Sequence, residues 1–131
     1  MLLWMFLIFL MSSFDATDSS NQSNFIVNII SNILNIENVS LLGLIIRKLA
    51  HFTEYLILGV LVINMFTKNN ARKYYLLSIL LCILYAISDE IHQFLIPGRA
   101  CQIKDILIDS IGSITGIYLY KLISKRKKSI N

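Results

Sequence analysis

Three runs of apolar residues, at about residues 44–66, 74–96 and 103–123, are each long enough to cross a lipid bilayer. A helix needs about 20 apolar residues to span a hydrocarbon core of about 30 Å. Ionisable side chains nevertheless lie near the ends of all three runs. Because a charged group is expensive to bury in a membrane, such side chains usually face the interior of a helix bundle or a water-filled cavity. This combination predicts an all-α membrane bundle with a polar site.

The composition supports an integral membrane protein. The chain of 131 residues is 56% hydrophobic and only 15% charged, and its mean hydropathy is +0.66, whereas soluble domains carry roughly 25% charged residues. The basic residues, which give a net charge of +4, concentrate in two short segments beside hydrophobic runs. That placement fits membrane topology and anionic lipid, so we expect no nucleic-acid partner. Cys82 and Cys101 are too far apart to pair, and we expect both to be small apolar fillers.

The N-terminal third predicts two further helices. Residues 1–14 are apolar but lack the positive n-region and the cleavage site of a signal peptide, so we expect an uncleaved first span, with a signal peptide as the alternative. Residues 24–42 carry apolar residues at helical spacing, which is typical of an amphipathic helix lying along the interface. The sequence therefore predicts one domain, residues 1–131: an integral membrane bundle of four transmembrane helices, with an interfacial helix between the first and the second.

The distribution of lysine and arginine predicts the orientation. A basic turn at residues 68–73 joins the second and third spans, and a basic tail at residues 124–131 follows the fourth. Basic residues favour the cytoplasmic side, and four spans with both termini in the cytoplasm place the turn and the tail there. Arg47 and Lys48 oppose this rule locally. In this orientation the polar residues of the last three spans, described next, lie near the outer ends of those spans.

The second span carries polar side chains near its outer end. Lys48, His51, Glu54 and Tyr55 share one helical face, since steps of three and four residues stack side chains. His51 and Glu54 are placed to hydrogen-bond to each other or to bind an ion together. The alternative is a histidine at a helix end that a carboxylate merely satisfies.

The third span ends in two adjacent acids. Asp89 lies one helical turn from Gln93, and Glu90 lies three residues from it. Two neighbouring acids in a low dielectric resist ionising together unless a cation or an arginine compensates. Arg99, in the loop that follows, is suited to bind a carboxylate or a phosphate with two hydrogen bonds. The alternative is an arginine that only neutralises Asp89 or Asp105.

The fourth span carries two acids and two glycines on one stripe. Asp105, Asp109, Gly112 and Gly116 repeat at intervals of four, three and four residues. Gly112 and Gly116 permit close helix approach, which is a packing role. We expect this contact to hold Asp109 against a neighbouring helix.

Three motifs follow one another over residues 48–116. They are Lys48-x-x-His51-Phe52-x-Glu54-Tyr55, then Asp89-Glu90-x-His92-Gln93-Phe94-x-x-Pro97-Gly98-Arg99, then Asp105-x-x-x-Asp109-x-x-Gly112-x-x-x-Gly116. Together they resemble the signature of the VanZ-like membrane protein family. The resemblance implies a small bacterial four-helix protein of the cytoplasmic membrane, and the family's namesake is associated with resistance to the glycopeptide teicoplanin. Asp109 departs from the pattern, because many relatives carry Asn there, and this argues against a strictly neutral hydrogen-bonding role.

Three functions remain open. The first is a cell-envelope protein whose outward polar site binds or modifies a cell-wall or lipid-linked molecule and affects teicoplanin susceptibility. The second is a membrane metal-binding protein, because two histidines and several carboxylates can bind Zn²⁺ or Mn²⁺. The third is a non-catalytic accessory protein whose polar cluster fixes the helix register. The ligand, any cofactor and the oligomeric state also remain open.

The candidate residues follow from the first function. If a reaction occurs, His51 with Glu54 would supply acid–base chemistry, and Arg99 would stabilise anionic charge. The candidate catalytic residues are His51, Glu54, Asp89, Glu90, Gln93 and Arg99. The candidate ligand-binding residues are Lys48, Tyr55, His92, Arg99, Asp105 and Asp109.

Overall fold

The structure, a computed structural model, describes the backbone of residues 1–14, 16–35, 38–66, 71–99 and 101–130, and side chains over the same ranges except at 16–23, 34, 71–73 and 125–130. The described residues form helices and contain no strand, which confirms the predicted all-α class. The helices are α1 (Leu2–Ser12), α2 (Ala16–Leu34), α3 (Val39–Phe66), α4 (Ala71–Phe94) and α5 (Ile103–Ile130).

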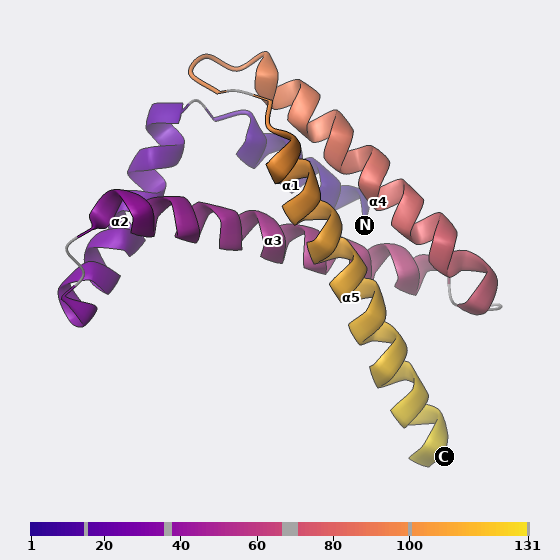
Figure 1. Cartoon of the computed structure of the whole chain (residues 1–131). Helices are drawn as coiled ribbons and strands as arrows, with labels where there is room; N and C mark the ends of the chain where they lie inside the picture. Colours follow the sequence, from indigo (N-terminus) through magenta and orange to yellow (C-terminus); the bar gives the residue numbers. More distant parts are fainter. Residues whose placement is uncertain (15, 36–37, 67–70, 100, 131) are drawn as a thin grey trace.

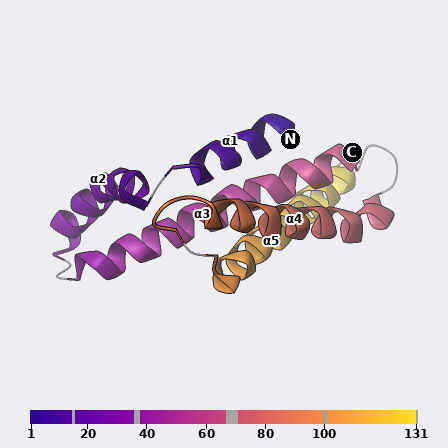
Figure 2. The same ribbon diagram turned by 90° about the horizontal axis from the view of Figure 1, so that it is seen from above.

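Helices α3, α4 and α5 form the bundle (Figures 1 and 2). Among the described helices, these three contain segments long and apolar enough to cross a membrane, namely Val39–Phe66, Tyr74–Phe94 and Ile103–Ser124. Their mean hydropathies are 1.6, 1.6 and 1.4. Figure 1 shows α5 crossing α3, with α4 beside the crossing. Three of the four predicted spans therefore correspond to helices of membrane-spanning length.

Helix α1 lies against the second half of α4. The Tyr85 hydroxyl donates a hydrogen bond to the carbonyl oxygen of Met5, and Ser12 Oγ donates one to Asp89 Oδ2. With 11 residues, the helix is shorter than the roughly 20 residues that a membrane span needs. The predicted count of four transmembrane helices is therefore not confirmed.

Helix α2 differs in its bounds from the predicted interfacial helix. It begins at Ala16 rather than near residue 24, and it ends at Leu34 because Asn35 adopts a positive φ of 49°. Asn38 then caps α3, since its Oδ1 accepts a hydrogen bond from the backbone N–H of Leu41 at 3.1 Å. Among the side chains of α2 that the structure describes, Val27 is buried. The apolar residues that predicted the amphipathic face are mostly exposed, among them Phe25, Ile26, Ile29 and Ile33.

The core of the bundle lies between α3, α4 and α5. Helix α3 contributes Tyr55, Leu58, Val62 and Ile63, and the other helices contribute Ile8, Cys82, Ala86 and Ile117. The outward face of α4 carries a stripe of exposed apolar side chains, as expected for contact with lipid. The stripe consists of Leu76, Leu80, Leu84, Ile87 and Ile91. Cys82 is buried as expected, whereas Cys101 is exposed and the expectation of a buried filler is wrong there.

Glycines bring α3 and α5 into backbone contact. A Cβ atom at Gly112 would lie 2.5 Å from the carbonyl oxygen of Phe52, and one at Gly116 would overlap the backbone of Leu56. A Cβ atom at Gly59 of α3 would overlap the backbone of α5 in the same way. This contact fixes the register of the two helices and sets the first part of α5, which carries Asp109, beside the middle of α3, which carries His51.

The basic segments that predicted the orientation, residues 68–73 and 125–128, have no described side chains. The direction in which the bundle crosses the membrane therefore stays a prediction.

Candidate functional site

One end of the bundle gathers polar groups from three helices. Helices α3 and α5 run from this end of the bundle and α4 runs towards it, because short connections join α3 to α4 and α4 to α5. The chain leaves α4 through a tight turn, in which Leu95 N donates a hydrogen bond to His92 O and Arg99 N donates one to Ile96 O. Gly98 within this turn has a φ of 76°, a conformation that favours glycine. The turn returns Arg99 to the end of the bundle.

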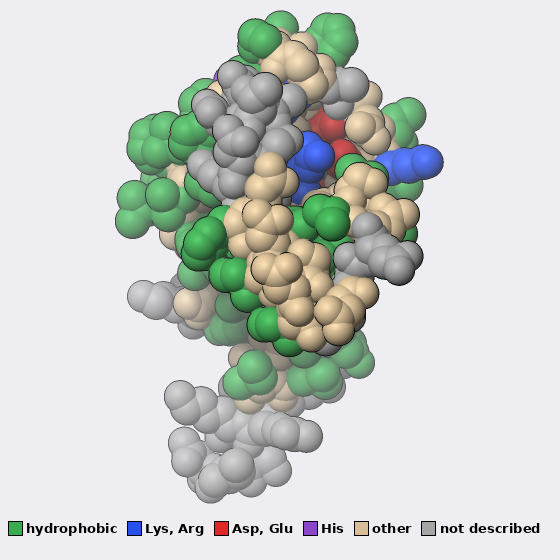
Figure 3. All heavy atoms as spheres, turned by 90° about the vertical axis from the view of Figure 1, so that its left-hand side faces the viewer, with side chains coloured by type: hydrophobic (Ala, Val, Ile, Leu, Met, Phe, Trp, Pro, Cys, Tyr) green, Lys and Arg blue, Asp and Glu red, His purple; other side chains and the backbone are tan. Residues whose placement is uncertain are grey.

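A cavity of about 350 Å³ opens at this end. Among the described residues, its wall carries four basic side chains and one acidic side chain, and Lys48 and Asp105 form an ion pair between α3 and α5. Figure 3 shows Lys and Arg side chains gathered beside Asp and Glu side chains on this face of the molecule. The lining residues are Leu44, Arg47, Lys48, His51, Gln93, Gly98, Arg99, Gln102, Lys104 and Asp105.

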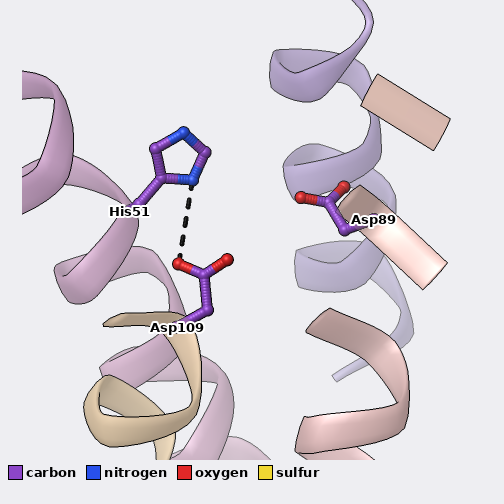
Figure 4. A group of neighbouring side chains, drawn as sticks. All are labelled: His51, Asp89 and Asp109. Carbon is purple, nitrogen blue, oxygen red and sulfur yellow. Dashed lines mark ion pairs between the residues drawn. The ribbon is translucent and has the colours of Figure 1, made fainter. Parts of the chain in front are cut away.

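A buried acidic group lies next to the cavity wall. His51 Nδ1 of α3 is 3.9 Å from Asp109 Oδ1 of α5, and Asp89 of α4 completes the group. One ligand atom from each of the three residues lies within 4.8 Å of the other two. Figure 4 shows the three side chains pointing into a common space between the helices. Asp89 and Asp109 are only 3% and 1% exposed, respectively.

Two hydrogen-bond networks hold the neighbouring acids of α4. Asp89 Oδ2 accepts hydrogen bonds from Ser12 Oγ at 2.9 Å and from Gln93 Nε2 at 3.0 Å. Glu90 is also buried, and its Oε1 accepts a hydrogen bond from the backbone N–H of Gln102 at 2.7 Å. Asp89 is thereby tied to α1, and Glu90 ties the end of α4 to the chain just before α5.

Other candidate residues lie apart from the cavity wall. The His92 ring stacks on Phe9 with ring centroids 4.3 Å apart, and its Nε2 is 3.1 Å from Ser13 Oγ. Tyr55 is fully buried in the core. The backbone carbonyl of Glu54 accepts a hydrogen bond from Trp4 Nε1. The structure thus brings His51 to Asp109 of another helix rather than to Glu54 of its own.

Several residues of this region were missed by the sequence analysis. Arg47 and Lys104 line the cavity, and Ser12 and Gln102 hold the buried acids. Arg47 did give a signal, because with Lys48 it opposed the positive-inside rule, as a basic residue would if a site rather than topology required it. No comparable signal marked Ser12, whose contact joins residues 77 positions apart.

Three helices of membrane-spanning length, closed at one end around a basic cavity and a buried acidic group, define a small α-helical membrane protein with a polar site. The family model for VanZ/LLP1 matches residues 1–124, so the chain belongs to the VanZ/LLP1 family. Neither the comparison with curated proteins nor that with solved structures gave a match.

Proposed function

We propose that the protein binds the anionic headgroup of a lipid-linked molecule of the bacterial envelope in the basic cavity, and so affects susceptibility to teicoplanin. The observation that carries the proposal is the charge of the cavity wall. Among the described lining residues, Arg47, Lys48, Arg99 and Lys104 are basic and Asp105, which forms an ion pair with Lys48, is acidic.

The cavity suits part of a headgroup rather than a whole lipid. Its volume of about 350 Å³ lies at the lower end of the range typical of small-molecule sites, roughly 300–1,000 Å³. Arginine binds phosphate oxygens with two parallel hydrogen bonds, whereas lysine acts as a point charge. The adjoining apolar surface of the bundle would contact the hydrocarbon chain of the same molecule.

The predicted orientation fits an envelope ligand. With the basic turn and the basic tail in the cytoplasm, as the positive-inside rule predicts, the cavity would open on the outer surface. Lipid-linked cell-wall precursors present their phosphates and sugars at this surface, where glycopeptides also act. The chain belongs to the VanZ/LLP1 family. The association of the family's namesake with teicoplanin resistance is consistent with a ligand at the outer surface.

The test compares Arg99→Ala and Lys104→Ala with Lys121→Ala, a matched loss of a cation far from the cavity, where Lys121 lies over the ring of Tyr75. A host expressing the wild type is expected to show reduced teicoplanin susceptibility, which the cavity variants lose and Lys121→Ala keeps at equal membrane levels. In detergent, a short prenyl phosphate should bind at least about tenfold more weakly to Arg99→Ala, because a hydrogen bond to a charged group contributes about 1.5–3 kcal/mol. The prenol without phosphate serves as the control ligand. Equal binding of phosphate and prenol would contradict the proposal.

A second candidate is a structural role for the polar groups. The hydrogen bonds that join Ser12, Asp89 and Gln93 favour it, because they tie α1 to α4. In that case the cavity variants would keep the susceptibility of the wild type, and the protein would act as a non-catalytic accessory subunit. The same strains therefore separate the two functions.

A further inference from the structure

We propose that His51, Asp89 and Asp109 bind one divalent transition-metal ion, Zn²⁺ or Mn²⁺. The site differs from the basic cavity in its charge and its depth, and it does not rest on headgroup binding. Imidazole nitrogen and carboxylate oxygen together form a donor set that suits both ions.

The geometry is close to that of a metal site. The three ligand atoms lie within 4.8 Å of one another, and each comes from a different helix of the bundle. Ligands about 2.1 Å from a tetrahedral ion are about 3.4 Å apart. Small side-chain rotations that draw the atoms together would therefore complete the site, and Figure 4 shows the three side chains directed into a common space.

One buried polar atom of each of these three side chains would gain a partner from a bound ion. Within the described residues, His51 Nδ1, Asp89 Oδ1 and Asp109 Oδ1 are buried and have no hydrogen-bond partner. A buried carboxylate without a partner is costly, since charged groups in a low dielectric require pairing or metal coordination. Two carboxylates and a neutral imidazole compensate the charge of a divalent ion without leaving net charge in the bundle.

Neighbouring groups hold the ligands in place. The Oδ2 atom of Asp89 is fixed by Ser12 and Gln93, and its Oδ1 is buried with no hydrogen-bond partner among the described residues. The close contact at Gly112 holds Asp109, one turn earlier on α5, against α3. Such supporting contacts orient metal ligands and raise affinity. The nearby Lys48 is held by Asp105 and does not occupy the site.

The proposed metal site also adjoins the basic cavity. His51 belongs both to the cavity wall and to the acidic group. Three protein ligands leave at least one coordination position of the ion open. The ion would therefore lie between the buried acids and the cavity, within reach of an anionic oxygen bound there.

The experiment uses the full chain, purified in mild detergent with an affinity tag free of histidine. After treatment with EDTA and desalting, the protein is incubated separately with Zn²⁺ and Mn²⁺, desalted again and analysed for metal by mass spectrometry. The wild type is expected to retain about one ion of at least one of the two metals per chain. His51→Gln and Asp109→Asn are expected to lower the retained metal at least tenfold. His92→Gln is the matched control, because His92 lies against Phe9 and Ser13, and it should retain the ion.

Size-exclusion chromatography and circular dichroism report whether each variant folds. X-ray absorption by the metal-loaded wild type gives a readout that needs no variant, because one imidazole and oxygen ligands should surround the ion. The proposal is overturned if folded wild type retains neither metal, if folded His51→Gln or Asp109→Asn retains it fully, or if the bound ion shows no imidazole ligand. The outcome is independent of teicoplanin susceptibility and of prenyl phosphate binding, so failure of one proposal leaves the other standing.

Discussion

The two oxygen atoms of Asp89 have different surroundings. Oδ2 accepts hydrogen bonds from Ser12 and Gln93, whereas Oδ1 is buried with no hydrogen-bond partner among the described residues. One side chain therefore joins α1 to α4 and also brings a carboxylate oxygen within 4.8 Å of ligand atoms of His51 and Asp109. Loss of a hydrogen bond to Oδ2 should lower the stability of the fold, whereas loss of His51 or Asp109 should lower metal binding.

Removal of the Ser12 hydroxyl tests the joining role. Ser12→Ala leaves the buried carboxylate with one donor fewer, so we expect the free energy of unfolding to fall by about 1–3 kcal/mol. Ser88→Ala is the matched control, because the Ser88 hydroxyl is exposed and donates a hydrogen bond to the carbonyl of Tyr85 in its own helix. That variant should stay within about 0.5 kcal/mol of the wild type. Denaturant unfolding in detergent provides the measurement, and equal stability of the two variants would contradict the structural importance of the bond.

The sequence identified most of these residues but not their pairing. The spacing of His51 and Glu54 on one helix was visible, and it led to the expectation that they act together. The structure places Asp109 3.9 Å from His51 instead. Steps of three and four residues show which side chains share a helical face, but not which face of another helix lies opposite. That information depends on where α5 crosses α3.

The crossing of α3 and α5 depends on glycine, and two glycines of this chain should respond to alanine in opposite ways. Gly116→Ala places a Cβ atom against the backbone of Leu56, which cannot move aside as a side chain can. We expect this variant to lose at least about 2 kcal/mol of stability or to fail to accumulate, as overpacking does elsewhere.

Gly43→Ala is the matched control. The nearest atom to its added Cβ is a methyl group of Val27 at 3.8 Å, an ordinary contact. Alanine is favoured over glycine in a helix by about 1 kcal/mol, so this variant should be as stable as the wild type or more stable. Thermal unfolding of the two purified variants measures the difference. Similar melting temperatures for both would show that α3 and α5 are not in backbone contact.

At the level of the helices, the sequence predicted which helices form better than it predicted where each helix begins and ends. Apolar runs of about 20 residues indicated α3, α4 and α5 because length and hydropathy are local properties. The start of α3 was placed five residues too late, because the stretch was assigned to the preceding helix and the cap by Asn38 was not recognised. The packing of α1 could not be predicted, because it depends on contacts with Tyr85 and Asp89, more than 70 positions away.

For the molecule as a whole, the orientation in the membrane can be tested with the cysteines already present. Cys101 is exposed in the loop beside the cavity, whereas Cys82 is buried in the core. If the cavity faces outward, a membrane-impermeant maleimide should label the chain in intact spheroplasts. Cys101→Ser should abolish the labelling, since the remaining thiol is inaccessible. Labelling that occurs only after the membrane is permeabilised would place the cavity on the cytoplasmic side.

The backbone contact between α3 and α5 also divides the bundle into a stiff pair and a third helix with more freedom. His51 and Asp109 belong to the stiff pair, so their backbone positions are held relative to each other, whereas Asp89 belongs to α4, which packs through side chains. A transmembrane helix adjusts its tilt when the hydrocarbon thickness of the bilayer changes. Tilting of α4 would alter the distance from Asp89 to the other two ligands, and the affinity of this site would then vary with the thickness of the surrounding membrane.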